Sequence, residues 1–258
     1  MLRFNTSGTN SDTVLGLYPV VQPGRAPSGV QTTTTDLWDR ADATPTQSVW
    51  TAPTVARVHA VVSASANDTA AGTGARTVKV YGLTAWTAVE TSETVIMAGA
   101  TPVNTTGSYV IIHRMVVLTT GSGGTNAGAI TATAATDTTV TATIRASVGV
   151  GQTEMAIYGW PSTQKLYVTS FSASIQLSSA GASHALARLL YNPEPTGTLA
   201  HFNEVDLMGL ESTGVSSQKI EYNPPLVLPG PGILKLNALA SANDLDVSGR
   251  FTAFLADN

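Results

Sequence analysis

The sequence of 258 residues predicts an all-β protein, an antiparallel β-sandwich of the jelly-roll type that follows an extended N-terminal arm. From residue 51 onward, short runs of β-branched and aromatic residues recur at regular spacing, separated by turns rich in Gly, Pro, Asn and Ser. A strand–loop–strand outline at residues 58–83 also returns at 167–191 and 233–255. The tetrapeptide Ser-Ala-Asn-Asp occurs in the first and the last of these copies, so we expect a sandwich built from hairpins.

The apolar runs give the expected strands in chain order. They are 55–63, 77–81, 94–98, 109–118, 129–134, 138–146, 154–158, 166–177, 185–191, 205–210, 218–228, 232–239 and 250–255. The segment 129–146 alternates small apolar residues with Thr, which is typical of exposed or interfacial strands. Residues 183–190 and 201–210 are also compatible with one or two helical turns.

Residues 1–50 are interrupted by prolines and glycines, and their apolar residues form short islands. We interpret residues 1–50 as an extended arm and residues 51–258 as the sandwich, with 147–152 as the best position for any further division. A flexible tail is the alternative, although disordered tails rarely carry large apolar residues. The arm would dock on another subunit through Leu17, Tyr18, Trp38 and Trp50, which are the candidate interface residues.

The composition excludes several classes of function. Charged residues make up 12% of the chain, about half the usual share of roughly 25%, and the net charge is −4. No basic field is therefore expected to gather a nucleic acid. The chain has no cysteine, which excludes disulfides and thiolate sites. No stretch has 18 consecutive apolar residues and no secretory leader is evident, so we expect no membrane partner and synthesis in a cytoplasm.

Residues that could hold a metal occur in patterns that are too sparse for a site. His201, Glu204 and Asp206 resemble a fragment of a metal cluster, but the second histidine at helical spacing is missing. The pairs Asn67-Asp68 and Asn243-Asp244 offer oxygen ligands for calcium, but few carboxylates lie nearby in the sequence. We therefore predict no metal site and no cofactor.

Catalytic patterns are equally weak. Glu90 and Glu93 are most simply solvated turn residues, and no G-x-S-x-G nucleophile elbow occurs. The segment 72–74, Gly-Thr-Gly, precedes an expected strand rather than a helix, so it predicts a tight turn and not a phosphate loop. Tryptophans could stack on sugars, but they more often anchor interfaces. We predict no catalytic residue and expect that the protein is not an enzyme.

The loop at residues 65–83, SANDTAAGTGARTVKVYGL, resembles a family of virion structural proteins from tailed bacteriophages. The resemblance covers residues 58–175. Its further segments are 90–95, 99–103, 109–117, 121–130, 152–158 and 161–172. It implies a virion component, either a capsid decoration (cement) protein or a tail-associated β-sandwich protein, and it supplies no catalytic residues.

The leading hypothesis is a decoration protein that is made in the host cytoplasm, forms a homo-oligomer and binds the major capsid protein on the outer shell of the head. A charge-poor surface loses little desolvation energy when it is buried between subunits. The alternative is a tail adaptor, a fibre-anchoring protein or a receptor-binding component with tail proteins as partners. A carbohydrate-active enzyme would need a pair of carboxylates, and no convincing pair is present.

Overall fold

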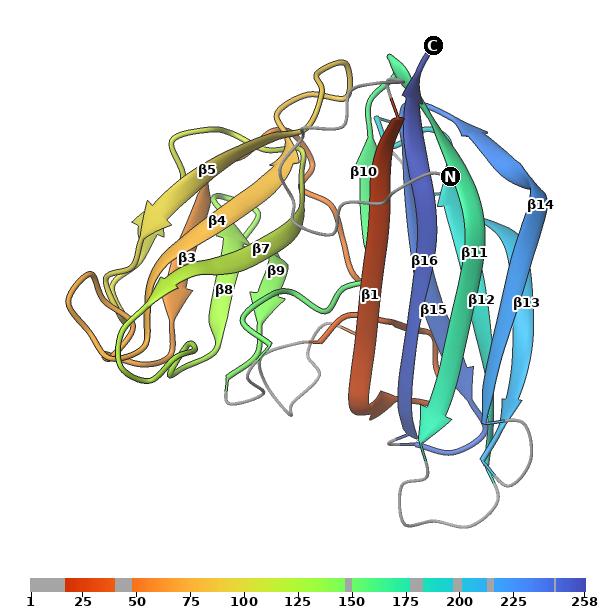
Figure 1. Ribbon diagram of the computed structural model, residues 1–258, viewed down its shortest axis with the longest axis horizontal. Helices are drawn as coiled ribbons and strands as arrows, with labels where there is room; N and C mark the ends of the chain where they lie inside the picture. Colours follow the sequence, from red (N-terminus) through yellow and green to blue (C-terminus); the bar gives the residue numbers. More distant parts are fainter. Residues whose placement is uncertain are drawn as a thin grey trace.

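A computed structural model describes residues 17–39, 48–146, 150–176, 183–196, 201–212, 216–243 and 245–258. These residues form sixteen β-strands and no helix, and the strands pair in antiparallel sheets (Figure 1), which confirms the all-β prediction. In this part of the chain, no helix could cross a membrane.

The larger of two β units is a sandwich of two sheets, drawn on the right in Figure 1. Sheet A contains, in spatial order, β1 (Leu17–Val30), β16 (Leu245–Asp257), β11 (Gln164–Gln176) and β14 (Ser217–Pro229). Sheet B contains β10 (Ile157–Trp160), β15 (Gly232–Ala240), β12 (His184–Asn192) and β13 (Asn203–Glu211). A short strand, β2 (Thr35–Asp36), also pairs with β15, beyond the end of β10.

Alternation along the strands of sheet A produces the core of the sandwich. In β11 and β16, every second residue over most of the length is apolar and buried, and the residues between them are mostly Ser, Thr or charged, apart from the stacked pair Tyr167 and Phe254. The largest apolar side chains buried between the sheets are Trp160, Phe171 and Phe251. The opposite, outward face of sheet A is therefore polar around Arg250 and Ser174, whereas nearer its other end it carries the stacked rings of Tyr167 and Phe254.

The smaller unit is inserted between β2 and β10 and lies beside the sandwich (Figure 1). One of its sheets contains β6 (Val103–Asn104), β3 (His59–Ser63), β8 (Ile130–Ala134) and β9 (Val140–Ile144). The other contains β5 (Thr91–Ile96), β4 (Ala75–Leu83) and β7 (Ile111–Thr120). A separate apolar cluster fills this inserted unit, with Val78, Val80, Ile111 and Met115 fully buried.

The N-terminal residues correct the expected domain organisation. Residues 17–30 were expected in an extended arm, but they form β1, which pairs with β16 almost along its whole length. Prolines are tolerated because β1 is an edge strand. Pro19, Pro23 and Pro27 are an even number of residues apart, so their missing donors all point to the same side of the strand, which is the free edge. The division into 1–50 and 51–258 therefore separates β1 and β2 from the sandwich to which they belong. Residues 1–16, 40–47 and 147–149 lie outside the described part of the chain.

The two segments for which helical turns were considered are strands. Residues 184–192 form β12 and residues 203–211 form β13, and the two strands pair with each other. Both segments are short enough for their periodicity to fit either structure, so long-range pairing decided the outcome.

Buried polar side chains join the inserted unit to the sandwich. The side-chain amide of Gln22 on β1 donates to the carbonyl oxygens of His113 (2.8 Å), Met155 (2.9 Å) and Ile157 (3.0 Å). Gly24 lies two residues after Gln22 on β1, and a Cβ at this position would lie 2.3 Å from the carbonyl oxygen of Leu37. β1 therefore packs closely against both segments through which the chain leaves and re-enters the sandwich.

Candidate functional site

The Ser-Ala-Asn-Asp loop of the inserted unit is organised by the buried carboxylate of Asp68. One oxygen accepts the backbone N–H groups of Ala75 (2.6 Å) and Ala127 (2.8 Å). The other accepts the hydroxyl of Ser63 (2.5 Å) and the N–H of Gly128 (2.9 Å). Four donors therefore occupy the carboxylate, which ties three loops together and leaves no role for it as a calcium ligand.

The neighbouring Gly-Thr-Gly segment is a turn, as the sequence predicts. The N–H of Gly72 donates to Thr69 and that of Gly74 donates to Asn67. A Cβ on Gly74 would lie 2.0 Å from Oδ1 of Asp68, so the close approach of the carboxylate requires glycine there. In the C-terminal copy of the tetrapeptide, the side-chain oxygen of Asn243 accepts the N–H of Thr32 (3.0 Å), whereas residue 244 lies outside the described residues.

The acidic candidates for catalysis do not converge. Glu90 lies 2.6 Å from Nε2 of His113 and accepts from the hydroxyl of Tyr158. Glu93 accepts the N–H of Thr106 (2.9 Å) instead. Each carboxylate has its own partners and fixes a different part of the fold.

His201, Glu204 and Asp206, the candidate metal ligands at and just before β13, also make separate contacts. His201 pairs with Asn203 (2.9 Å), Glu204 forms an ion pair with Arg188 (3.3 Å), and Asp206 accepts the hydroxyl of Tyr222 (2.8 Å). Across the described ranges, no three His, Asp or Glu side chains are grouped so that they could hold a metal ion.

The four predicted interface residues differ in how deeply they are buried. Leu17 and Tyr18 are half-buried at the start of β1. Trp38 and Trp50 are 1% and 3% exposed, and they belong to the apolar cluster that fills the inserted unit. The indole N–H of Trp50 donates to the carbonyl oxygen of Thr141. Trp38 and Trp50 therefore cannot dock on another subunit in this fold, because their side chains are packed inside this chain.

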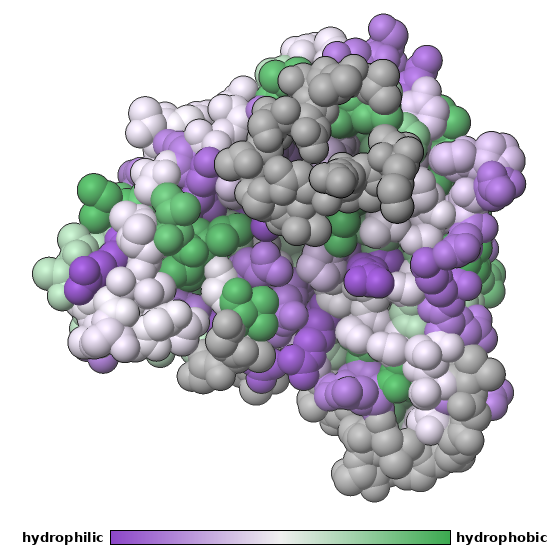
Figure 2. All heavy atoms as spheres, in the orientation of Figure 1, coloured by the Kyte–Doolittle hydropathy of each residue, from purple (hydrophilic) through white to green (hydrophobic). Residues whose placement is uncertain are grey.

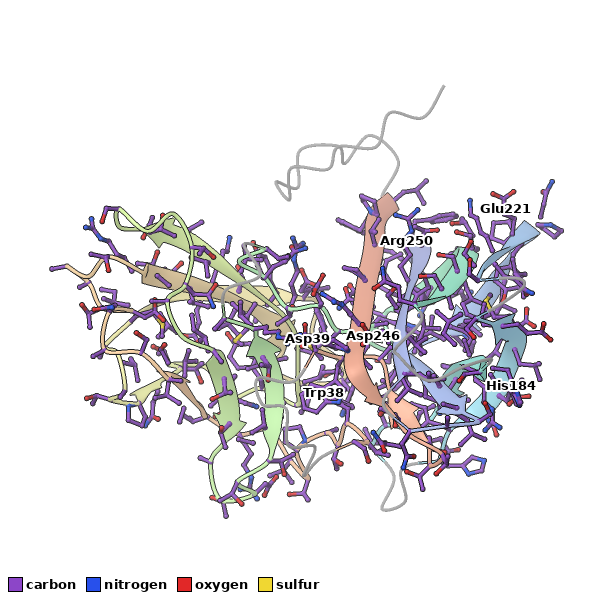
Figure 3. The ribbon with its side chains drawn as sticks, turned by 90° about the horizontal axis from the view of Figure 1, so that it is seen from below. Trp38, Asp39, His184, Glu221, Asp246 and Arg250 are labelled. Atoms are coloured by element: carbon purple, nitrogen blue, oxygen red, sulfur yellow. The ribbon has the colours of Figure 1, made fainter. Side chains whose placement is uncertain are left out.

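The outward face of sheet A carries a broad open trough, and sequence reasoning did not find it. The trough encloses about 860 Å³ and is lined by residues of β1, β16, β11 and β14 together with Glu154 from the segment that returns to the sandwich. Figure 2 shows that mainly hydrophilic and weakly polar residues cover this side of the sandwich. Arg250 and Glu221 lie on the opposite side of the sandwich from His184 (Figure 3).

Strand register arranges the lining in rows across sheet A. One row contains Pro23, Arg250, Ser172 and Lys219, and the next contains Arg25, Ser248, Ser174 and Ser217. The hydroxyls of Ser174 and Ser248 are hydrogen-bonded at 2.8 Å. The floor is therefore a grid of hydroxyl groups flanked by cationic side chains.

The charges around the trough are mixed. Lys219 is paired with Glu221 on the same strand. Glu154 and Asp246 add negative charge to the lining, while Arg25 and Arg250 add positive charge. The trough is thus suited to a polar ligand of low charge density rather than to a dense polyanion.

Asp39 lies next to Glu154 of the trough lining, because its backbone N–H donates to the carbonyl oxygen of Glu154 (2.8 Å). Its side chain is 2% exposed, and neither carboxylate oxygen accepts a hydrogen bond from any of the described residues. Arg145 lies 3.6 Å away, and Arg25 and Glu154 are also near enough to influence it. Burial, opposed by Arg145, raises the pKa of Asp39 to about 6.

The charge of Asp39 should destabilise the fold above pH 6. Because its pKa is higher in the folded state than its ordinary value of 3.8, stability is lost as pH rises from about 4 to about 6. D39N should therefore unfold at the same temperature as the wild type near pH 4 and be about 2 kcal/mol more stable at pH 7.5. Thermal unfolding at both pH values provides the measurement. A variant that is less stable at pH 7.5 would show instead that Arg145 stabilises the charge.

No protein-family model matches the chain, and neither a curated protein nor a solved structure matches it.

Proposed function

We propose that the protein is a non-enzymatic structural component of a tailed-phage virion, built on a jelly roll with an inserted β unit. Strand pairing supports the jelly-roll assignment. β1 pairs with β16, β2 and β10 pair with β15, β11 pairs with β14, and β12 pairs with β13. The first half of the sandwich strands thus pairs with the second half in reverse order, as in a long hairpin rolled into two sheets.

The observation that carries the structural role is the outward face of sheet A. It is broad and combines rows of Ser side chains with charged side chains of both signs and with the stacked rings of Tyr167 and Phe254, so a partner of complementary shape and charge could cover it. In the described part of the chain, the acidic groups considered for catalysis make contacts that hold loops or strands together. This pattern favours binding over catalysis.

Among virion proteins, we place a capsid decoration (cement) protein first. Its partner would be the major capsid protein, and copies of this chain would contact one another as a homo-oligomer around the symmetry axes of the shell. Each interface would need about 800 Å² from each partner to be specific. Weak contacts repeated over a shell add up through multivalency, so a single copy needs no high affinity.

A tail location is the second candidate, and the trough itself favours it. A concave polar surface suits a receptor-binding or adaptor protein better than a flat cement contact. Tail proteins would then be the partners.

Particles from which this protein has been stripped test the cement role. Stripped heads should lose their DNA at a lower temperature than intact heads, and adding back the purified protein should restore the resistance. Heads that are equally robust with and without the protein would exclude a cement role and leave the tail alternative.

A further inference from the structure

Two arginines on neighbouring strands of sheet A form no close ion pair in the described part of the chain, although Arg25 is near enough to Asp39 to act on its charge. Arg25 on β1 lies opposite Ser248, and Arg250 on β16 lies opposite Pro23, so the two are diagonal neighbours in the trough. Within the described residues, neither guanidinium makes an ion pair or a hydrogen bond, whereas Lys219 in the same lining is paired with Glu221. Arg250 is exposed and Arg25 is half-buried.

The groups beside these arginines are hydroxyls and amides. Ser172, Ser174, Ser217 and Ser248 form the floor, and Gln176 lies beside them, opposite Asp246. β16 and β11 are interior strands of sheet A, so their backbone donors and acceptors are already used by neighbouring strands. A ligand on this face can therefore bind side chains only, unlike a peptide that adds to the edge of a sheet.

We propose that the trough binds a polysaccharide that carries carboxylate groups. Sugar hydroxyls match the hydroxyl and amide groups of the floor, which can both donate and accept. The planar guanidinium groups of Arg25 and Arg250 match a carboxylate in a bidentate arrangement. A volume of about 860 Å³ lies within the usual range of ligand sites, roughly 300–1,000 Å³, and admits a segment of a few sugars.

The acidic residues of the lining narrow the class of ligand. Glu154 and Asp246 would repel a polymer with a charge on every unit, such as a nucleic acid. Their repulsion would be weaker for a polysaccharide whose carboxylates are separated by neutral sugars. Trp38, Trp50 and Trp160 are buried and cannot stack on sugars. Within the trough, recognition therefore depends on its polar and charged side chains, and the half-buried rings of Tyr167 and Phe254 lie further along the same face. Polysaccharide binding would be a property of the chain itself, in addition to its proposed role in a virion. It can therefore be tested on the isolated chain, without a particle.

Titration calorimetry of the full chain at low salt tests the proposal with three probes. The first is an oligosaccharide of about six sugars in which uronic acids alternate with neutral sugars, such as a hyaluronan fragment. The second is a neutral dextran fragment of similar length, and the third is a poly-glutamate peptide. The hyaluronan fragment should bind, and the dextran fragment should bind at least tenfold more weakly.

Two double variants locate the binding. R25A/R250A should weaken hyaluronan binding at least tenfold. K79A/R114A removes the same charge from the exposed side of β4 and β7 and should leave binding unchanged. S174V should weaken hyaluronan binding but leave any binding of poly-glutamate unchanged. The thermal unfolding of each variant, compared with the wild type, shows that the sandwich remains folded.

Three results would overturn the proposal. They are no binding of the hyaluronan fragment, equal losses in the two double variants, and tighter binding of poly-glutamate, which would assign the trough to an acidic protein segment. None of these results bears on whether the protein belongs to a virion, so failure here and failure of the proposed function are distinguishable.

Discussion

Replacing Asp68 by Ala should lower the free energy of unfolding of the inserted unit by roughly 4 kcal/mol. The substitution leaves the N–H groups of Ala75, Ala127 and Gly128 and the hydroxyl of Ser63 without their acceptor. Unsatisfied buried donors retain their full desolvation cost, and here several of them share one carboxylate. Urea unfolding measures the loss, and hydrogen exchange should show faster exchange at these amides.

The adjacent Asn67 provides the matched control. Its side chain is exposed, and its backbone carbonyl makes the turn contact, so N67A should change stability by less than about 0.5 kcal/mol. If D68A and N67A had similarly small effects, the carboxylate would not be the organiser of this loop.

Breaking the buried ion pair of Lys235 and Asp36 should have a comparable effect. Nζ of Lys235 lies 2.8 Å from Oδ2 of Asp36, and the two side chains are 4% and 0% exposed. The same carboxylate oxygen accepts the N–H of Trp50, and the ammonium lies 4.2 Å from the centroid of the Phe202 ring. K235M leaves a buried carboxylate without its cation and should cost about 3–5 kcal/mol, measured by urea unfolding.

Lys219 and Glu221 form an exposed ion pair that serves as the control, with side chains that are 51% and 70% exposed. K219M should cost less than about 1 kcal/mol. The double variant D36L/K235M should recover part of the loss, because apolar replacement of both partners removes the buried charge but leaves the N–H of Trp50 without its acceptor. Equal effects of K235M and K219M would contradict a stabilising buried ion pair between β2 and β15.

The strand prediction succeeded where alternation and turn residues are local signals. β4, β7, β11 and β15 lie within a few residues of the expected positions. β1 was missed because proline was read as an interruption, and the chemistry that makes proline tolerable depends on where a strand lies in its sheet. The nested pairing that encloses the inserted unit depends on contacts between distant residues, such as Leu17 with Ala256, which no local pattern encodes.

The sequence of β15 contains a sign of its burial on both faces that the strand prediction did not use. Lys235 and Asn237 stand within the apolar run of β15, and almost every residue of that strand is buried. A charged residue at alternate positions in a strand normally faces solvent, but here the inserted unit covers the second face of the strand. The burial of Trp38 and Trp50 has the same cause, because the unit that covers them is built from residues far from them in the sequence.

The trough was beyond sequence reasoning for a related reason. Arg25, Ser174, Lys219 and Arg250 are each unremarkable in the sequence, and their rows exist only through the register of four strands. By contrast, the Gly-Thr-Gly turn depends on local chemistry, and its prediction was confirmed.

The proposed virion role is tested most directly by the number of copies of this protein in purified particles of a tailed phage whose genome carries its gene. Quantitative mass spectrometry against an isotope-labelled standard, scaled to the major capsid protein, gives this number. The account predicts hundreds of copies per particle for a head decoration protein, and about six to eighteen for the tail alternative, as the symmetry of each location requires. Purified infectious particles that contain none of the protein would contradict a structural role in the virion.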